Sequence, residues 1–156
     1  EHRQNIHVIV QLNDGNESKL LAYDVKVTDK IIDFKTRIQK EVKIPIDEQN
    51  LYSGNTHLRD FETFKYYQIQ NNTVLRFFSW TIYCTTPTIQ HTFSINICPD
   101  NYIYDVKRKI ESKVGYEAYR MFLCHNDKQL IDDMLIKNYP ITNWSTIHIM
   151  FRYMGG

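Results

Sequence analysis

Glycine, proline and long apolar runs are scarce in this chain of 156 residues, which has five glycines and four prolines. Flexible linkers and disordered segments are rich in such residues and poor in aromatics, whereas 13% of this chain is aromatic. No apolar run approaches the roughly 20 residues that a membrane-spanning helix needs. We therefore expect an ordered protein with no membrane among its partners.

The chain also lacks an excess of charge of either sign. Nineteen Lys and Arg residues against 18 Asp and Glu residues leave a formal net charge of +1. Domains that bind nucleic acid by general electrostatics are usually clearly basic. We therefore expect no nucleic acid among the partners.

Cysteines are few, and their odd number and wide spacing do not form a disulfide framework. They are Cys84, Cys98 and Cys124. The N-terminal residues show no signal-peptide apolar core, so we expect reduced thiols and a cytoplasmic or nuclear protein. Asn-X-Ser/Thr triplets leave secretion open as an alternative. These triplets begin at Asn16, Asn71 and Asn143.

Residue types that carry catalysis do not fall into a recognisable pattern. Cys124 and His125 are neighbours, but neighbours in a strand point to opposite faces and cannot form a nucleophile–base pair. The sequence contains no Cys-x-x-Cys or His-x-x-x-His spacing for zinc and no glycine-rich phosphate loop. We expect a protein that is not an enzyme and binds no metal or cofactor.

The strongest signal is an internal repeat. Shifting the chain by 72 residues, the distance from Ile31 to Ile103, aligns its two halves without a gap from about residue 21 to residue 78. Leu51 then falls on Leu123. A repeat of this length suits a complete small domain rather than a solenoid unit. The sequence therefore predicts two similar domains in tandem.

Each half has the same pattern of strands and one helix. Alternation of apolar and polar residues predicts strands in the first half. They cover residues 6–10, 21–27, 50–52 and 73–78. Ile31, Phe34 and Ile38 recur at spacings of three and four, which predicts a helix with one buried face. The order strand–strand–helix–strand–strand indicates an α+β unit, a mixed sheet with one main helix.

At these residues the chain resembles the ubiquitin family, twice over. In the first half the resemblance rests on Lys35, Ile38, Pro45, Gln49, Leu58, Asp60 and Tyr67, and in the second on Lys107, Ile110, Gln129, Leu130, Asp132, Tyr139 and His148. It implies two tandem β-grasp domains, at residues 5–78 and 81–150, with a linker at 79–80 and a flexible tail at 151–156. The architecture is similar to that of the interferon-induced two-domain modifiers, which would suggest a role in immunity or antiviral defence.

The end of the chain is similar to the ubiquitin tail in the same register. It reads Phe151, Arg152, Tyr153, Met154, Gly155 and Gly156. The resemblance implies that activating, conjugating and ligase enzymes join Gly156 to target lysines, with the ATP bound by the activating enzyme. Because glycine has no Cβ, Gly155 and Gly156 suit a narrow enzyme channel. Those enzymes would recognise residues 151–154, and among these only Arg152 is the same as in the ubiquitin tail.

The altered tail favours dedicated activating and conjugating enzymes, together with a deconjugating protease. The first half ends without a diglycine, so the tandem is expected to act as one unit and as a monomer.

The resemblance also implies a partner surface. At Phe78 the alternative is packing between the two domains. The positions of this surface are Cys124, His148 and Met150 in the second half, and Tyr52, Arg76 and Phe78 in the first.

Two lysines coincide with positions that carry chains in ubiquitin, Lys128 and Lys107, and the alternative for Lys128 is an ordinary surface charge. Lys35 and Lys107 are also expected to pair with nearby acids.

Two other functions remain open. One is a non-covalent interaction module, such as a docking unit within a larger protein, in which the diglycine has no role. The other is a signalling protein that acts through surface contacts outside cells.

Overall fold

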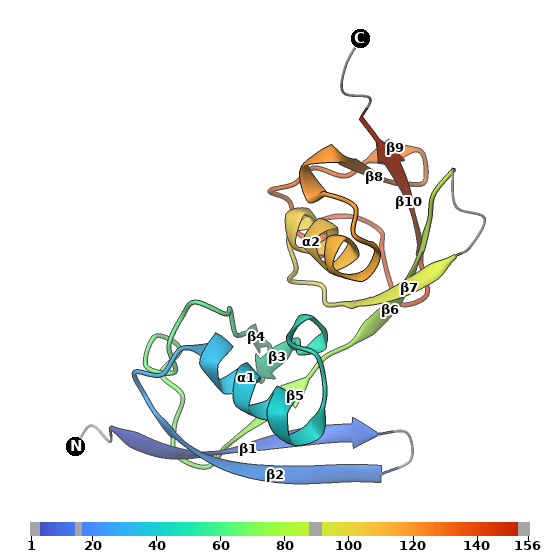
Figure 1. Cartoon of the computed structure of the whole chain (residues 1–156). Helices are drawn as coiled ribbons and strands as arrows, with labels where there is room; N and C mark the ends of the chain where they lie inside the picture. Colours follow the sequence, from blue (N-terminus) through green and yellow to red (C-terminus); the bar gives the residue numbers. More distant parts are fainter. Residues whose placement is uncertain (1–3, 15–16, 88–91, 153–156) are drawn as a thin grey trace. The chain divides into compact units, whose positions relative to one another are not determined.

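The computed structural model describes residues 4–14, 17–87 and 92–152, and the chain forms two units, Glu1–Phe78 and Ser79–Gly156. We refer to them as unit 1 and unit 2. Figure 1 shows that each unit has a twisted sheet with one helix across it.

Unit 1 is a mixed sheet covered by one helix on a single face (Figure 1). Its elements are β1 (Asn5–Asp14), β2 (Glu17–Lys26), α1 (Ile31–Val42), a 3-10 helix (Ile46–Glu48), β3 (Leu51–Ser53), β4 (Thr56–His57) and β5 (Thr73–Phe77). The strand order is β2-β1-β5-β3-β4. Within it β1 pairs antiparallel with β2 and parallel with β5.

Unit 2 repeats this topology, with the strand order β7-β6-β10-β8-β9. Its strands are β6 (Trp80–Thr85), β7 (Phe93–Ile97), β8 (Met121–His125), β9 (Lys128–Gln129) and β10 (Thr146–Phe151). Its helix is α2 (Ile103–Val114), and 3-10 helices cover Ala118–Arg120 and Ile136–Asn138. The predicted α+β class, a mixed sheet with one main helix, is confirmed in both units.

The helix face predicted from spacing is the face that is buried. In unit 1, Ile31, Phe34 and Ile38 are at most 1% exposed and belong to one core cluster with Val8 and Leu75. Burying a side chain of this size stabilises the fold by about 2 kcal/mol. Unit 2 has an equivalent core on its own helix, built from Ile103, Val106, Ile110, Leu123, Ile147 and Ile149.

Both helices end on a residue in the left-handed backbone region. The residue after α1 is Lys43, with a φ of 62°, and the residue after α2 is Gly115, with a φ of 81°. In each case the backbone N–H of this residue donates to a carbonyl four residues earlier, which satisfies one of the last groups of the helix.

Two boundaries differ from the sequence-based expectation. Trp80 is not part of a linker, because it begins β6 and lies opposite Ile97 in the register of β7. Phe151 is not part of the tail, because it is the last residue of β10 and lies opposite Met121. The expected linker therefore loses Trp80, and the expected tail loses Phe151.

Candidate functional site

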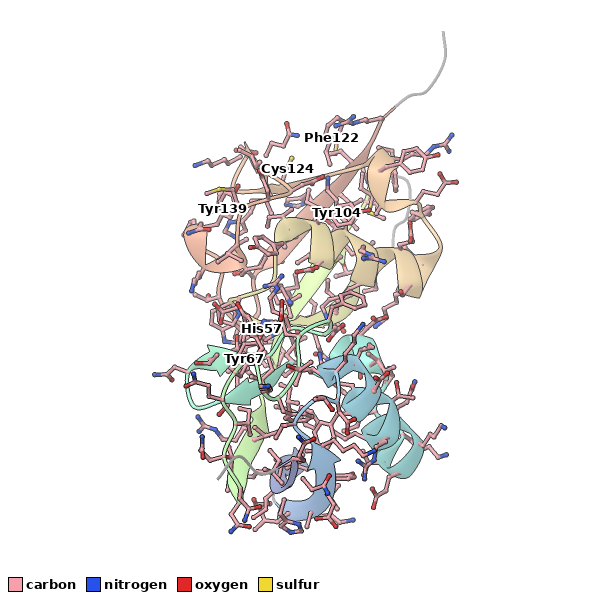
Figure 2. The ribbon with its side chains drawn as sticks, turned by 90° about the vertical axis from the view of Figure 1, so that its left-hand side faces the viewer. His57, Tyr67, Tyr104, Phe122, Cys124 and Tyr139 are labelled. Carbon is pink, nitrogen blue, oxygen red and sulfur yellow. The ribbon has the colours of Figure 1, made fainter. Side chains whose placement is uncertain are left out.

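The outer face of β8 and β10 brings together the three partner-surface residues predicted in unit 2. Alternation along β10 buries Ile147 and Ile149 and leaves His148 and Met150 on the opposite, exposed face. Cys124 lies directly opposite His148 in the antiparallel register. Figure 2 labels Cys124 on β8. Because directly opposite residues share a face, Cys124, His148 and Met150 form one surface.

This surface contains an open cavity of about 520 Å³. Its lining residues are Thr85, Thr86, Pro87, Cys124, Asp127, His148 and Met150. The parallel register of β6 and β10 places Thr85 beside His148, and Thr85 Oγ1 lies 2.7 Å from His148 Nδ1. Thr85, His148 and Cys124 therefore form a row across three neighbouring strands.

The hairpin between β8 and β9 supplies one wall of the cavity. Asn126 and Asp127 have φ values of 51° and 64° and connect the paired residues His125 and Lys128. Two residues with positive φ form the tight hairpin turn in which Asn and Asp are favoured. Sequence reasoning missed Asp127 as a lining residue, although the Asn-Asp pair between two strands was the local signal for it.

The end of β10 is held by two aromatic contacts. The ring of Phe151 meets that of Tyr116 edge to face at 4.7 Å, so it is packed rather than presented for tail recognition. Arg152 donates its backbone N–H to the Arg120 carbonyl, and its guanidinium lies 4.4 Å from the ring centre of Phe122. This is a cation–π contact, which restrains an otherwise exposed arginine. The other predicted tail residues lie outside the described residues, namely Tyr153, Met154, Gly155 and Gly156.

The corresponding positions in unit 1 are not presented in the same way. Tyr52 lies opposite Arg76 in the register of β3 and β5, but only 7% of Tyr52 is exposed. Its ring lies 5.1 Å from His57 and 5.6 Å from Phe78. Arg76 is exposed. Tyr52 therefore offers little surface to a partner, because neighbouring rings cover it.

The two candidate lysines have different surroundings. Lys107 is only 5% exposed, and its Nζ lies 2.5 Å from the Asp132 carboxylate. Lys35 is buried in the same way and pairs with the more exposed Asp60 carboxylate at 2.6 Å. The predicted pairing with acids is confirmed, and it makes Lys107 unsuitable for chain formation because the amine is enclosed. Lys128 is exposed on β9, so it remains a candidate.

The cysteines also differ in accessibility. Cys84 and Cys98 are buried, whereas Cys124 is partly exposed. Burial raises the pKa of the Cys84 thiol to about 12, an effect that the nearby Lys113 ammonium reduces. Cys124 and His125 point to opposite faces, as predicted, since His125 is buried behind the sheet and Cys124 faces the cavity.

Within the described ranges, no group of three His, Cys, Asp or Glu side chains is arranged to hold a metal ion. No helix in that part of the chain is both long and apolar enough to cross a membrane.

A comparison with models of protein families matches the same family at two places in the chain. The model of the ubiquitin family matches residues 6–78 and again residues 85–153. Each match lies wholly within one structural unit.

Proposed function

Because the chain belongs to the ubiquitin family and consists of two β-grasp domains in tandem, we propose that it is a protein modifier joined through Gly156 to lysines of target proteins. Domains of this family are usually non-catalytic. The reactive group is then the terminal carboxylate of Gly156, and activating, conjugating and ligase enzymes supply the chemistry and the ATP.

The observation that carries the proposal is the position of the diglycine relative to the last strand. β10 ends at Phe151, and Gly155 and Gly156 follow at the distance that the ubiquitin tail has from its own last strand. The contact of Phe151 with Tyr116 fixes the point at which the tail leaves unit 2. A fixed starting point and two residues without Cβ atoms suit insertion of the carboxylate into a narrow enzyme channel.

The same region supports dedicated enzymes. Arg152 is restrained over the ring of Phe122, so an activating enzyme would meet an arginine and an aromatic side chain together. Tyr153 and Met154 add side chains that differ from those of the ubiquitin tail. We infer that the cognate activating and conjugating enzymes, and the deconjugating protease, recognise this combination.

The outer face of β8 and β10 is proposed as the surface that non-covalent receptors contact. Met150 is 44% exposed beside an open cavity, whereas the core residues of the same strand are fully buried. Exposed apolar groups with a polar rim are typical of contact surfaces. Receptor binding is expected to involve unit 2 more than unit 1, because Tyr52 is covered.

The proposal is tested by expressing the chain with an N-terminal tag in its own host, with and without Gly155 and Gly156. Lysates are then blotted under reducing, denaturing conditions. A ladder of heavier tagged species that requires the diglycine is expected, and mass spectrometry should find the C-terminus joined to lysine amines. Met134→Leu, on the exposed surface far along the chain from the tail, is the matched control and should leave the ladder unchanged.

Adducts that persist without the diglycine would exclude this route of attachment. A single free band in every sample, under several stress conditions, would favour the second candidate, a non-covalent interaction module. The cavity beside Met150 is the observation that favours this second function. Met150→Asp should then abolish partner capture while removal of the diglycine leaves it intact.

Three further parts of the proposal concern the setting of the protein. We infer a monomer, a cytoplasmic or nuclear location, and a defence role similar to that of the interferon-induced two-domain modifiers. Sedimentation, fractionation of the host and measurement of transcript levels after infection would test them in turn.

A further inference from the structure

A thiol, an imidazole and a thioether line one cavity in unit 2. Cys124 and His148 are directly opposite each other on β8 and β10, a relation that brings Cβ atoms to within about 5 Å. Met150 is two residues beyond His148 on the same face and is a diagonal neighbour of Cys124, which a long side chain can reach. All three line the same cavity.

The imidazole is oriented by its neighbour on β6. Thr85 Oγ1 lies 2.7 Å from His148 Nδ1. With the proton on Nδ1, His148 donates to the threonine hydroxyl oxygen and keeps the lone pair of Nε2 for another group. Histidines that ligate metals commonly have their second ring nitrogen fixed by such a hydrogen bond.

The types of donor decide which metals fit. No three His, Cys, Asp or Glu side chains within the described residues form a metal cluster, and Met150 is the second sulfur side chain that lines the cavity beside Cys124. Thiolate and thioether sulfur select soft ions, and imidazole also binds copper. We propose that Cys124, His148 and Met150 form a binding site for a soft monovalent metal ion, copper(I) in particular.

Binding involves no change of oxidation state. The Cys124 thiol loses its proton to solvent as the sulfur–copper bond forms, and His148 and Met150 each add a lone pair. The ion enters with one positive charge and the thiolate supplies one negative charge, so the filled site is neutral. The Asp127 carboxylate on the cavity wall attracts the incoming cation.

Unit 1 is an internal control for this site. Its corresponding positions are Tyr52, Arg76 and Phe78, which include no sulfur or imidazole donor. The other thiols of the chain, Cys84 and Cys98, are buried. A folded chain should therefore bind one ion, and the effect of replacing His148 or Met150 separates this site from uptake by the Cys124 thiol alone.

The test is an anaerobic titration of the reduced, full chain with copper(I) against a coloured copper(I) chelator. One equivalent should bind and produce sulfur-to-copper absorption in the ultraviolet. Cys124→Ser should remove the binding, and His148→Gln and Met150→Leu should each weaken it by at least tenfold. Met134→Leu and His7→Gln replace an exposed methionine outside the cavity lining and a partly exposed histidine of unit 1, and they should leave the affinity unchanged.

X-ray absorption of the loaded protein should show two sulfur and one nitrogen neighbours around copper. The proposal is overturned by an unchanged affinity in Met150→Leu, by binding that survives Cys124→Ser, or by zinc(II) binding as tightly as copper(I). Circular dichroism of each variant confirms that the fold is retained. None of these outcomes depends on conjugation through Gly156, so the two proposals can fail separately.

Discussion

The two helix ends provide a test of backbone strain in which each unit serves as the control for the other. Lys43 and Gly115 occupy the same left-handed position after their helices. For a residue with a Cβ, this backbone conformation is less stable by about 1–2 kcal/mol. A Cβ added at Gly115 would meet no atom within 4 Å, so Gly115→Ala introduces backbone strain without a clash.

The unfolded state offsets part of this cost, because replacing glycine removes conformational freedom worth about 0.4–1 kcal/mol. Gly115→Ala should therefore destabilise unit 2 by about 1 kcal/mol. Lys43→Gly reverses the change and should stabilise unit 1 by a similar or somewhat smaller amount. For a domain of this size, about 1 kcal/mol corresponds to a shift of roughly 4–8 °C in Tm.

The assay can follow each unit separately. The chain has two tryptophans, Trp80 and Trp144, and both belong to unit 2. Tryptophan fluorescence during urea unfolding thus reports unit 2, whereas circular dichroism reports both units. The fluorescence midpoint should fall in Gly115→Ala and stay unchanged in Lys43→Gly. Gly115→Asn should cost less than Gly115→Ala, since asparagine tolerates this conformation better. Equal stability of Gly115→Ala and the parent chain would refute the reasoning.

Three other predictions concern buried groups. Asp132→Asn leaves the buried Lys107 ammonium without its half-exposed carboxylate partner, and should lower the unfolding free energy of unit 2 by about 2 kcal/mol in urea. A thiol reagent should modify Cys124 alone in the native chain, because burial protects Cys84 and raises its pKa to about 12; mass spectrometry counts the labels. Burial raises the pKa of Tyr23 above that of an exposed tyrosine, which is about 10. Folding stability should therefore fall as the pH rises above about 10, because the unfolded state loses the tyrosine proton first. In urea titrations at pH 8–11, Tyr23→Phe should reduce this loss of stability.

Local patterns predicted most of the fold. Ile31, Phe34 and Ile38 specify a helical face by spacing alone, and the repeat carried that assignment to unit 2. The two-residue strands β4 and β9 were not predicted, because pairing with a neighbouring strand defines them and their length leaves no periodicity to read.

The candidate site divides in the same way. The resemblance to the ubiquitin family predicted Cys124, His148 and Met150 as one surface, and the register of β8 and β10 puts all three on one face. Phe151 was assigned to the tail by the same resemblance, and its contact with Tyr116 could not be predicted from the residues next to it in the sequence. Lys107 was expected to be a modification site as well as an ion-pair partner, and its burial depends on a carboxylate far along the chain.

The parallel pairing of first and last strands determines how each unit responds to a pulling force. In unit 1 β1 lies parallel to β5, and in unit 2 β6 lies parallel to β10. A load applied between the two ends of a unit pulls these neighbours in opposite directions along their length. Their hydrogen bonds are then sheared together rather than opened one after another. The chain should therefore resist a motor that pulls it end to end more strongly than its thermodynamic stability suggests. Unit 2, with the shorter parallel register, should yield first.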